Sequence, residues 1–331
     1  MRVLLAARFH ESGQTTHVVE LAKALQRLGH AVEVAALRRS HPRALAAYGE
    51  ELSRAGIPCR PAPAYAAFRS VVDSFAPDVV HGHSSTAVPF LLKARLERGA
   101  PFVVTCHGLG VPARCPNVAL ADRCIAVGPN VARELERHGI RPLVIQNGVD
   151  TERFCPGPKS EKLTVAYVGR IDGAKRRGLE ELVRAVRRIP EARLLVASNE
   201  RPRGAGDAAL GWVHDVPRLL ATSHFVCGTG RAVREGMASG CIALVLGVAY
   251  GGPVTPERFE GAAFPSFSGL EGAPPRAEAI RADIVRLAQD PAARTALSAW
   301  SREYACSRFP ISRMAEEVLA AYEDALRGRR R

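Results

Sequence analysis

The chain contains the segment Cys227-Gly-Thr-Gly-Arg-Ala-Val-Arg-Glu-Gly-Met-Ala-Ser-Gly240, in which a glycine-rich turn leads into a predicted helix. Glycines let the backbone approach a ligand closely, and the first turn of a helix offers unpaired N–H groups at the positive end of its dipole. The pattern predicts a phosphate-binding turn, with Glu235 placed about one turn further on, where its carboxylate can accept hydrogen bonds from ribose hydroxyls. Alone, the segment is equally consistent with an ordinary strand–loop–helix corner that carries a surface glutamate.

Around this segment, predicted strands alternate with amphipathic helices, which indicates an α/β fold with two mostly parallel, doubly wound sheets. We expect strands at residues 3–7, 31–36, 57–61, 78–81, 102–106, 123–127, 143–146, 163–168, 193–197, 224–226 and 242–246. We expect helices at 15–28, 43–55, 65–75, 86–98, 129–138, 178–188, 215–221, 231–238, 276–289, 291–304 and 311–326. The Gly- and Pro-rich residues 249–275 are expected to form an irregular loop.

The alternation is interrupted once, at the turn Asn147-Gly-Val-Asp150 and the connector Cys155-Pro-Gly-Pro-Lys159. We therefore predict a first Rossmann-like domain over residues 1–152, a second over 153–305, and a crossing helix with a basic tail over 306–331. Ligands of open α/β sheets bind beyond the carboxyl ends of the strands, so the two sheets are expected to face each other across a ligand-binding cleft.

The composition narrows the class of protein. With 331 residues, 47% of them apolar and 24% charged, the chain is globular and long enough for two domains. The net charge of +13 favours anionic ligands, and because no nucleic-acid motif accompanies it we expect no nucleic-acid partner. The N-terminal apolar run is too short for a signal peptide, so we expect a cytoplasmic protein. Because the surface is basic, we also expect it to contact anionic membrane peripherally. The eight cysteines include no C-x-x-C pair, which favours reduced thiols.

Three histidines follow predicted strands. His81-Gly-His83 has metal-ligand spacing, but no carboxylates complete a site, and we predict no metal there; a metal hydrolase is the least favoured alternative. His107, next to Gly108, can reach a ligand as a neutral donor or acceptor, although a structural histidine fits the same position. The first strand is followed by Gly13, which permits a close approach of the loop to a ligand.

Two cations flank another predicted turn, Gly169-Arg-Ile-Asp-Gly-Ala-Lys175. The guanidinium of Arg170 offers a planar fork of donors and Lys175 a mobile point charge, so the two can converge on one diphosphate. A pair of surface cations is the alternative.

Taken in order, the motifs resemble those of retaining glycosyltransferases of the GT-B fold, family four. The resemblance covers nearly the full length and rests on Thr16–Val34, Asp78–His83, Thr105–Gly108, Asn147–Phe154, Val168–Lys175 and Glu235–Gly240. It implies that Arg170 and Lys175 hold the donor diphosphate and stabilise the departing nucleoside diphosphate, that Glu235 binds the ribose, and that His107 contacts the transferred sugar. It assigns the remaining donor-binding residues to the first loop and the glycine turn, namely Gly13, Gly228, Thr229, Gly230, Arg231 and Ala232, with Gly211–Asp215 near the base.

The resemblance implies a metal-independent enzyme of the hexosyltransferase type, with no cofactor. It would move a sugar from a nucleotide sugar, UDP-sugar first and GDP-sugar second, to a glycan or lipid-linked acceptor in cell-envelope polysaccharide synthesis. One departure bears on the sugar: the family commonly carries a glutamate eight positions before Glu235, where this chain has Cys227. Two alternatives therefore stay open, a UDP-sugar epimerase and a catalytically idle sugar-nucleotide-binding protein.

Overall fold

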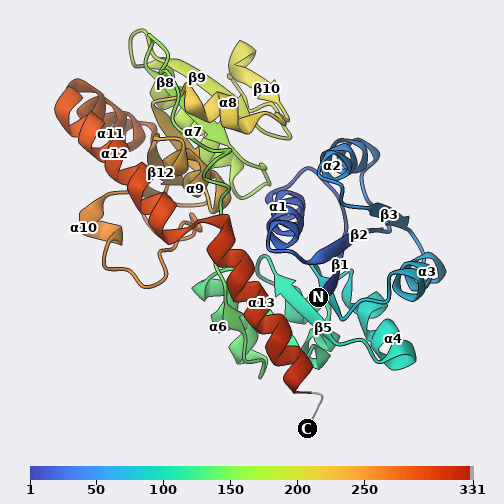
Figure 1. Cartoon of the computed structure of the whole chain (residues 1–331). Helices are drawn as coiled ribbons and strands as arrows, with labels where there is room; N and C mark the ends of the chain where they lie inside the picture. The colour runs from blue at the N-terminus through green and yellow to red at the C-terminus, as the bar shows by residue number, and fades with distance from the viewer. Residues whose placement is uncertain (329–331) are drawn as a thin grey trace. The chain divides into compact units, whose positions relative to one another are not determined.

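The computed structural model describes residues 1–328 and divides the chain into two compact units. The first unit comprises Met1–Gly148 and the returning segment from Ile311 onward, and the second comprises Val149–Pro310. Figure 1 labels their helices and strands. All eight cysteines are unpaired thiols.

The first unit is built on a seven-stranded sheet in the order β3-β2-β1-β4-β5-β6-β7, in which every neighbouring pair is parallel. Its strands are β1 (Arg2–Ala7), β2 (Ala31–Leu37), β3 (Cys59–Ala62), β4 (Val79–Gly82), β5 (Phe102–Cys106), β6 (Arg123–Ala126) and β7 (Leu143–Val144). Its helices are α1 (Gly13–Arg27), α2 (Pro42–Arg54), α3 (Tyr65–Phe75), α4 (Val88–Arg98), α5 (Val111–Arg114), the 3₁₀ helix η1 (Pro116–Leu120), α6 (Pro129–Arg137) and α13 (Ile311–Arg327).

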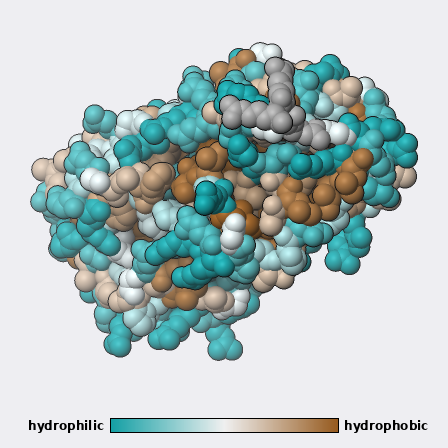
Figure 2. All heavy atoms as spheres, turned by 90° about the horizontal axis from the view of Figure 1, so that it is seen from below, coloured by the Kyte–Doolittle hydropathy of each residue, from teal (hydrophilic) through white to brown (hydrophobic). Residues whose placement is uncertain are grey.

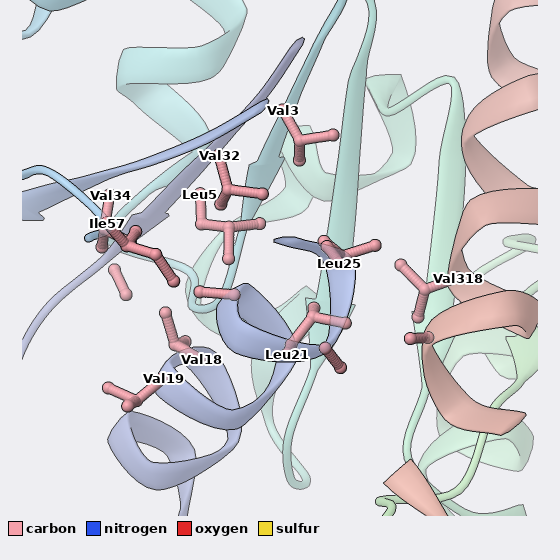
Figure 3. Close-up of a cluster of buried hydrophobic side chains, with 14 of the residues drawn as sticks. Val3, Leu5, Val18, Val19, Leu21, Leu25, Val32, Val34, Ile57 and Val318 are labelled. Atoms are coloured by element: carbon pink, nitrogen blue, oxygen red, sulfur yellow. The ribbon is translucent and has the colours of Figure 1, made fainter. Parts of the chain in front are cut away.

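Both faces of this sheet are buried. Successive side chains of a strand point to opposite faces, and β1 follows this rule: Val3 and Leu5 join one hydrophobic cluster, whereas Leu4 joins the other. Figure 3 shows the first cluster, in which Leu21 of α1 and Val318 of α13 also take part. A strand buried on both faces reads as a continuous apolar run, which is why β1 could be recognised in the sequence.

The last helix, α13, belongs to the first unit and packs against α1, β5 and β6, which confirms the predicted crossing helix. The chain enters it beside Gly148, where an added Cβ would lie 2.8 Å from the Ile311 Cα. The Gly148 N–H also donates to Met314 Sδ at 3.0 Å. Further along α13, the ring of Tyr322 is fully buried in the first cluster. The helix is therefore an integral part of this unit's core.

The second unit contains a six-stranded sheet in the order β10-β9-β8-β11-β12-β13, parallel except for the β12–β13 pair. Its strands are β8 (Thr164–Val168), β9 (Arg193–Ala197), β10 (Ala209–Gly211), β11 (Phe225–Gly228), β12 (Ile242–Leu246) and β13 (Tyr250–Pro253). Its helices are α7 (Arg176–Arg187), η2 (Gly206–Ala208), α8 (Val216–Ala221), α9 (Arg231–Ala238), α10 (Pro256–Phe259), α11 (Ala277–Gln289) and α12 (Pro291–Arg308). Two doubly wound sheets confirm the predicted fold class.

The expectation of an irregular loop over residues 249–275 is wrong for the first part of this segment, which contains β13 and α10; residues 260–275 contain no helix or strand. The antiparallel β13 completes the sheet edge, and its Tyr250 donates a hydrogen bond from its hydroxyl to Asp283 Oδ2 at 2.8 Å. Gly251 lies so close to β12 that an added Cβ would be 3.1 Å from Val245 Cβ. The glycines here allow the strand backbone to pack closely against its neighbour. From composition alone, such a glycine-rich strand could not be distinguished from a loop.

The surface of the described part is mixed. In the face drawn in Figure 2, hydrophobic residues are visible in patches among hydrophilic ones. Among residues 1–328, no helix has the length and apolar character needed to cross a membrane.

Candidate functional site

The second unit places two predicted loops side by side at the point where its strand order reverses. Strands β8 and β11 are parallel neighbours, and the chain continues from them in opposite directions, to β9 on one side and to β12 on the other. The loop of residues 169–175 leaves β8 and the turn at Thr229–Gly230 leaves β11, both at the carboxyl ends. The strand ends from which they leave are paired, and a Cβ added at Gly228 would lie 2.8 Å from the Val168 carbonyl oxygen. A topological switch point of this kind is where open α/β sheets bind ligands.

The glycine turn has a defined conformation. Gly230, the N-cap of α9, has φ 56° and ψ −112°, a backbone conformation that side chains other than hydrogen disfavour. Its N–H donates to the Phe267 carbonyl at 2.7 Å, and the Ala232 N–H donates to the Thr229 carbonyl at 3.2 Å. The N–H groups of Gly230 and Ala232, two of the residues expected to bind the donor, thus have backbone partners in this structure. They could serve a phosphate only by exchanging those partners.

The two charged residues of the turn form a buried ion pair. Arg231 donates to Glu235 Oε1 from Nη2 at 2.7 Å and from Nε at 3.1 Å. Their side chains are only 7% and 8% exposed. The pair occupies positions i and i+4 of α9, which face each other on a helix. The Glu235 carboxylate, predicted to bind ribose, is therefore held in a fixed orientation by Arg231.

A second arginine, Arg234, was not among the predicted site residues. It is fully buried, and its guanidinium carbon lies 5.2 Å from the centroid of the Phe267 ring and 4.8 Å from that of Phe309. Burial, followed by the charge of Arg231, lowers the pKa of Arg234 to about 10, so it stays protonated at neutral pH. Together with Arg231 and Glu235 it leaves a net positive charge near the beginning of α9, which suits an anionic ligand.

The loop of residues 169–175 is held from the neighbouring strand end. Asn199, just after β9, accepts from the Ile171 N–H at 2.7 Å and donates to the Ile171 carbonyl at 3.2 Å. This amide bridge fixes the loop, while Arg170 is exposed. Lys175 Nζ lies 3.8 Å from Asp172 Oδ2, an ion pair across the same loop. Asn199 and Ile171 are 28 positions apart, so the sequence did not reveal this contact.

Cys227 is part of strand β11 and is fully buried in the hydrophobic cluster between this sheet and helices α7 and α11. Burial raises the pKa of its thiol, so the group stays protonated and apolar in character. The prediction placed it at the start of the phosphate turn. The structure instead makes it a core residue, and the turn begins after Gly228.

The first unit brings three histidines together at its own switch point, which lies between β1 and β4. Gly13 is the first residue of α1, and His17 lies one turn further along this helix. His83 follows β4 and His107 follows β5, and His83 Nδ1 lies 3.2 Å from His107 Nε2. The His17 ring centroid is 4.7 Å from that of His107 and 5.3 Å from that of His83.

His81 has a structural role beside this group. Its Nδ1 lies 2.6 Å from the Tyr322 hydroxyl and its Nε2 lies 2.8 Å from Thr105 Oγ1. Burial lowers the pKa of His81 to about 3 and that of His83 well below its usual value, so both imidazoles are neutral. His17 was missed as a site residue; the available signal was a polar side chain on the apolar face of a predicted helix.

Comparison with known proteins agrees with this architecture. Residues 12–153 match the family model described as Glycosyltransferase Family 4. Among curated protein sequences, none is significantly similar to this chain.

Several solved structures share the fold over the whole length. HepE of Anabaena in complex with UDP and glucose is 16% identical, with a TM-score of 0.74, 98% of this chain covered and 99% of that one. Sucrose-phosphate synthase of Thermosynechococcus elongatus is 18% identical, with a TM-score of 0.71 and coverage of 99% and 100%. UDP-GlcNAc 2-epimerase of Neisseria meningitidis, bound to UDP-GlcNAc, is 14% identical, with a TM-score of 0.61 and coverage of 99% and 100%. The first part of the chain, residues 12–153, is thus similar to glycosyltransferase family 4, and the chain has the GT-B fold over its whole length.

Proposed function

We propose that this protein is a retaining glycosyltransferase that transfers a hexose from a UDP-sugar to a glycan or lipid-linked acceptor. The observation that carries the proposal is the switch point of the second unit, where two loops with cationic side chains leave neighbouring parallel strands. A buried arginine pair at the start of α9 adds positive charge to the same edge. This chemistry suits a diphosphate. The complexes of HepE with UDP and glucose support UDP as the nucleotide.

In this proposal the chain's own cations assist departure of the nucleotide. When the bond between the sugar and the diphosphate breaks, negative charge grows on the leaving oxygen, and preorganised cations stabilise that charge more in the transition state than in the ground state. Arg170 supplies the planar donor fork and Lys175 the point charge. Arg231, Arg234 and the dipole of α9 add to the same field.

Recognition of the nucleoside is assigned to Glu235. Its carboxylate accepts hydrogen bonds from ribose hydroxyls, in a position fixed by Arg231. His107 of the first unit is proposed to contact the transferred sugar, and Gly13 to allow the first loop to approach the donor. We place the acceptor in cell-envelope polysaccharide synthesis, at an anionic membrane that the basic surface contacts.

Two observations favour other functions enough to test them. The fold is shared over nearly the full length with a UDP-GlcNAc 2-epimerase, which supports the alternative of a UDP-sugar epimerase. The buried Cys227, in place of the family's glutamate, supports the alternative of a protein that binds a sugar nucleotide without turning it over.

The test combines binding with turnover. Calorimetry of the purified protein with UDP, GDP and their sugars measures the nucleotide preference, and NMR of the anomeric proton follows transfer to glycan and lipid-linked acceptors. We expect UDP to bind more tightly than GDP, and Arg170→Ala to weaken UDP binding and slow transfer at least tenfold. Arg188→Ala, which removes an exposed ion pair with Glu278 in the same unit, is the matched control and is expected to change neither.

The outcomes separate the three functions. Conversion of a UDP-sugar into its epimer without an acceptor identifies the epimerase, and tight UDP binding without any turnover identifies the idle binding protein. If Arg170→Ala and Arg188→Ala bind UDP as well as the unmodified protein does, the assignment of the diphosphate site is wrong.

A further inference from the structure

The three histidines at the switch point of the first unit have the arrangement of metal ligands. One ring nitrogen of each of His17, His83 and His107 lies within 4.8 Å of those of the other two. They come from three different elements, α1 and the segments after β4 and β5. Among residues 1–328, this is the group of three or more histidine, cysteine or acidic side chains that could hold an ion. Fold topology has therefore gathered residues that are 66 and 24 positions apart in the sequence (83 − 17 and 107 − 83).

The distances fit a tetrahedral ion. Zinc binds imidazole nitrogen at about 2.0–2.1 Å, which places two nitrogens on the same tetrahedral ion roughly 3.3 Å apart. The separation of His83 Nδ1 and His107 Nε2, 3.2 Å, matches that value. The third nitrogen needs a shift of roughly 1.5 Å at most, a change within reach of a small side-chain rotation.

The His83 ring is held in place by its surroundings. Its Nδ1 is the nitrogen that faces His107 Nε2, and its other nitrogen, Nε2, is buried. Its ring also lies against that of His81, with centroids 4.0 Å apart, and His81 is fixed through both nitrogens by Tyr322 and Thr105. This contact with a fixed ring limits how the His83 ring can turn, as outer partners of metal-bound histidines do.

The residue types select the class of ion. Neutral imidazole is a good ligand for zinc, copper, nickel and cobalt, and a poor one for magnesium and calcium, which prefer oxygen. Three histidines occupy three positions of a tetrahedral zinc ion and leave the fourth open to water or an anion. We propose that His17, His83 and His107 form a site for a divalent transition-metal ion, and that Zn²⁺ is the ion it takes.

Binding of the ion follows from the first unit alone and does not depend on the proposed function. One consequence does rest on that function. If His107 contacts the transferred sugar, a zinc ion that occupies its Nε2 competes with this contact, so added Zn²⁺ slows transfer while the diphosphate site in the second unit still binds UDP.

The experiment uses the full-length protein without an affinity tag, because a histidine tag would bind the same ions. After dialysis against a chelator, ZnCl₂ is titrated calorimetrically, and X-ray absorption at the zinc edge counts the imidazole ligands. We expect one equivalent to bind with three imidazoles, and His107→Gln to weaken binding at least tenfold. His138→Gln, an exposed histidine of the same unit that follows α6, is the matched control and is expected to bind Zn²⁺ like the unmodified protein.

Each outcome is decisive. The absence of stoichiometric Zn²⁺ binding, or fewer than three imidazoles at the bound ion, overturns the site. Equal weakening of binding by His107→Gln and His138→Gln also overturns it. Because ligand counting is done on the unmodified protein, the proposal stays testable if His107→Gln fails to fold. UDP affinity is measured in parallel. Because the Zn²⁺ titration contains no UDP and the UDP titration contains no Zn²⁺, failure of the zinc site can be told apart from failure of the donor-site assignment.

Discussion

The buried pair of Arg231 and Glu235 allows a quantitative test of how the nucleotide turn is held. Both side chains are less than 9% exposed and are joined by two hydrogen bonds. Removing one partner of a buried pair costs about 3–5 kcal/mol, because the other charge stays buried without compensation. Glu235→Ala leaves Arg231 next to the buried Arg234, so we place its cost at the upper end of that range. For a unit of this size, a cost of about 5 kcal/mol lowers the melting temperature by about 10–20 °C.

A double-mutant cycle separates the interaction from the individual side chains. Arg231→Ala and Glu235→Ala should each destabilise strongly, whereas the double variant removes both charges and should cost far less than the sum. We expect a coupling energy of about 2–3 kcal/mol, the upper range for residues in direct contact. The free energies come from chemical denaturation followed by tryptophan fluorescence and circular dichroism, with UDP affinity measured on each folded variant.

The exposed pair of Arg188 and Glu278 is the matched control. Its side chains are 58% and 74% exposed and its N–O distance is 2.7 Å, the same as in the buried pair. Exposed pairs contribute about 0–1 kcal/mol, so Glu278→Ala should change stability little. Equal effects of Glu278→Ala and Glu235→Ala, or additive effects within the cycle, would refute the reasoning that burial makes the first pair matter.

Three further predictions concern the second unit. Gly236→Ala should destabilise by about 1–3 kcal/mol in chemical denaturation, because its Cβ would lie 2.1 Å from Val226 Cγ1; unchanged stability would contradict this. Asn199→Ala should weaken UDP binding in calorimetry by freeing the loop at Ile171, with melting temperature little changed; unchanged affinity would show that the loop needs no such support. Burial, followed by Arg294 and Lys159, lowers the pKa of His224, so the unfolded state binds more protons below about pH 6.5 and stability falls as the pH drops through that range. His224→Asn should flatten this dependence between pH 7.5 and 5.5; equally steep curves would contradict it.

The fold was predictable because both sheets are covered on both faces. Strand β12 is buried throughout and β1 is buried after Arg2, so both read as apolar runs, and the helices between the strands carry one apolar face. The predicted ends differ from the observed ones by a few residues at most, but the short elements α5, η1, η2 and β10 were not predicted, and neither were β13 and α10 within residues 249–275. In that segment β13 contains Gly251, which packs closely against β12. The strand therefore lacks the apolar pattern by which a strand is recognised in a sequence.

The site was less predictable because its key contacts join distant residues. The ion pair of Arg231 with Glu235 follows helical spacing and could have been inferred from the sequence. The stacking of Arg234 on Phe267 and Phe309 could not, since those aromatic residues are 33 and 75 positions away (267 − 234 and 309 − 234). The same holds for the meeting of His17, His83 and His107, which only the order of strands β1, β4 and β5 explains.

Cys227 shows why a family spacing alone does not transfer a chemical role. A carboxylate can contact a sugar only if it reaches the ligand, but position 227 lies within a central strand and faces a hydrophobic cluster. A glutamate introduced there would bury an unpaired charge, at a cost of several kcal/mol or by becoming protonated. Restoring the family's residue would therefore damage the core without supplying a ligand for the sugar. In this chain the nucleotide-binding turn and the strand before it are under separate constraints: the turn needs charge, and the strand needs apolar volume.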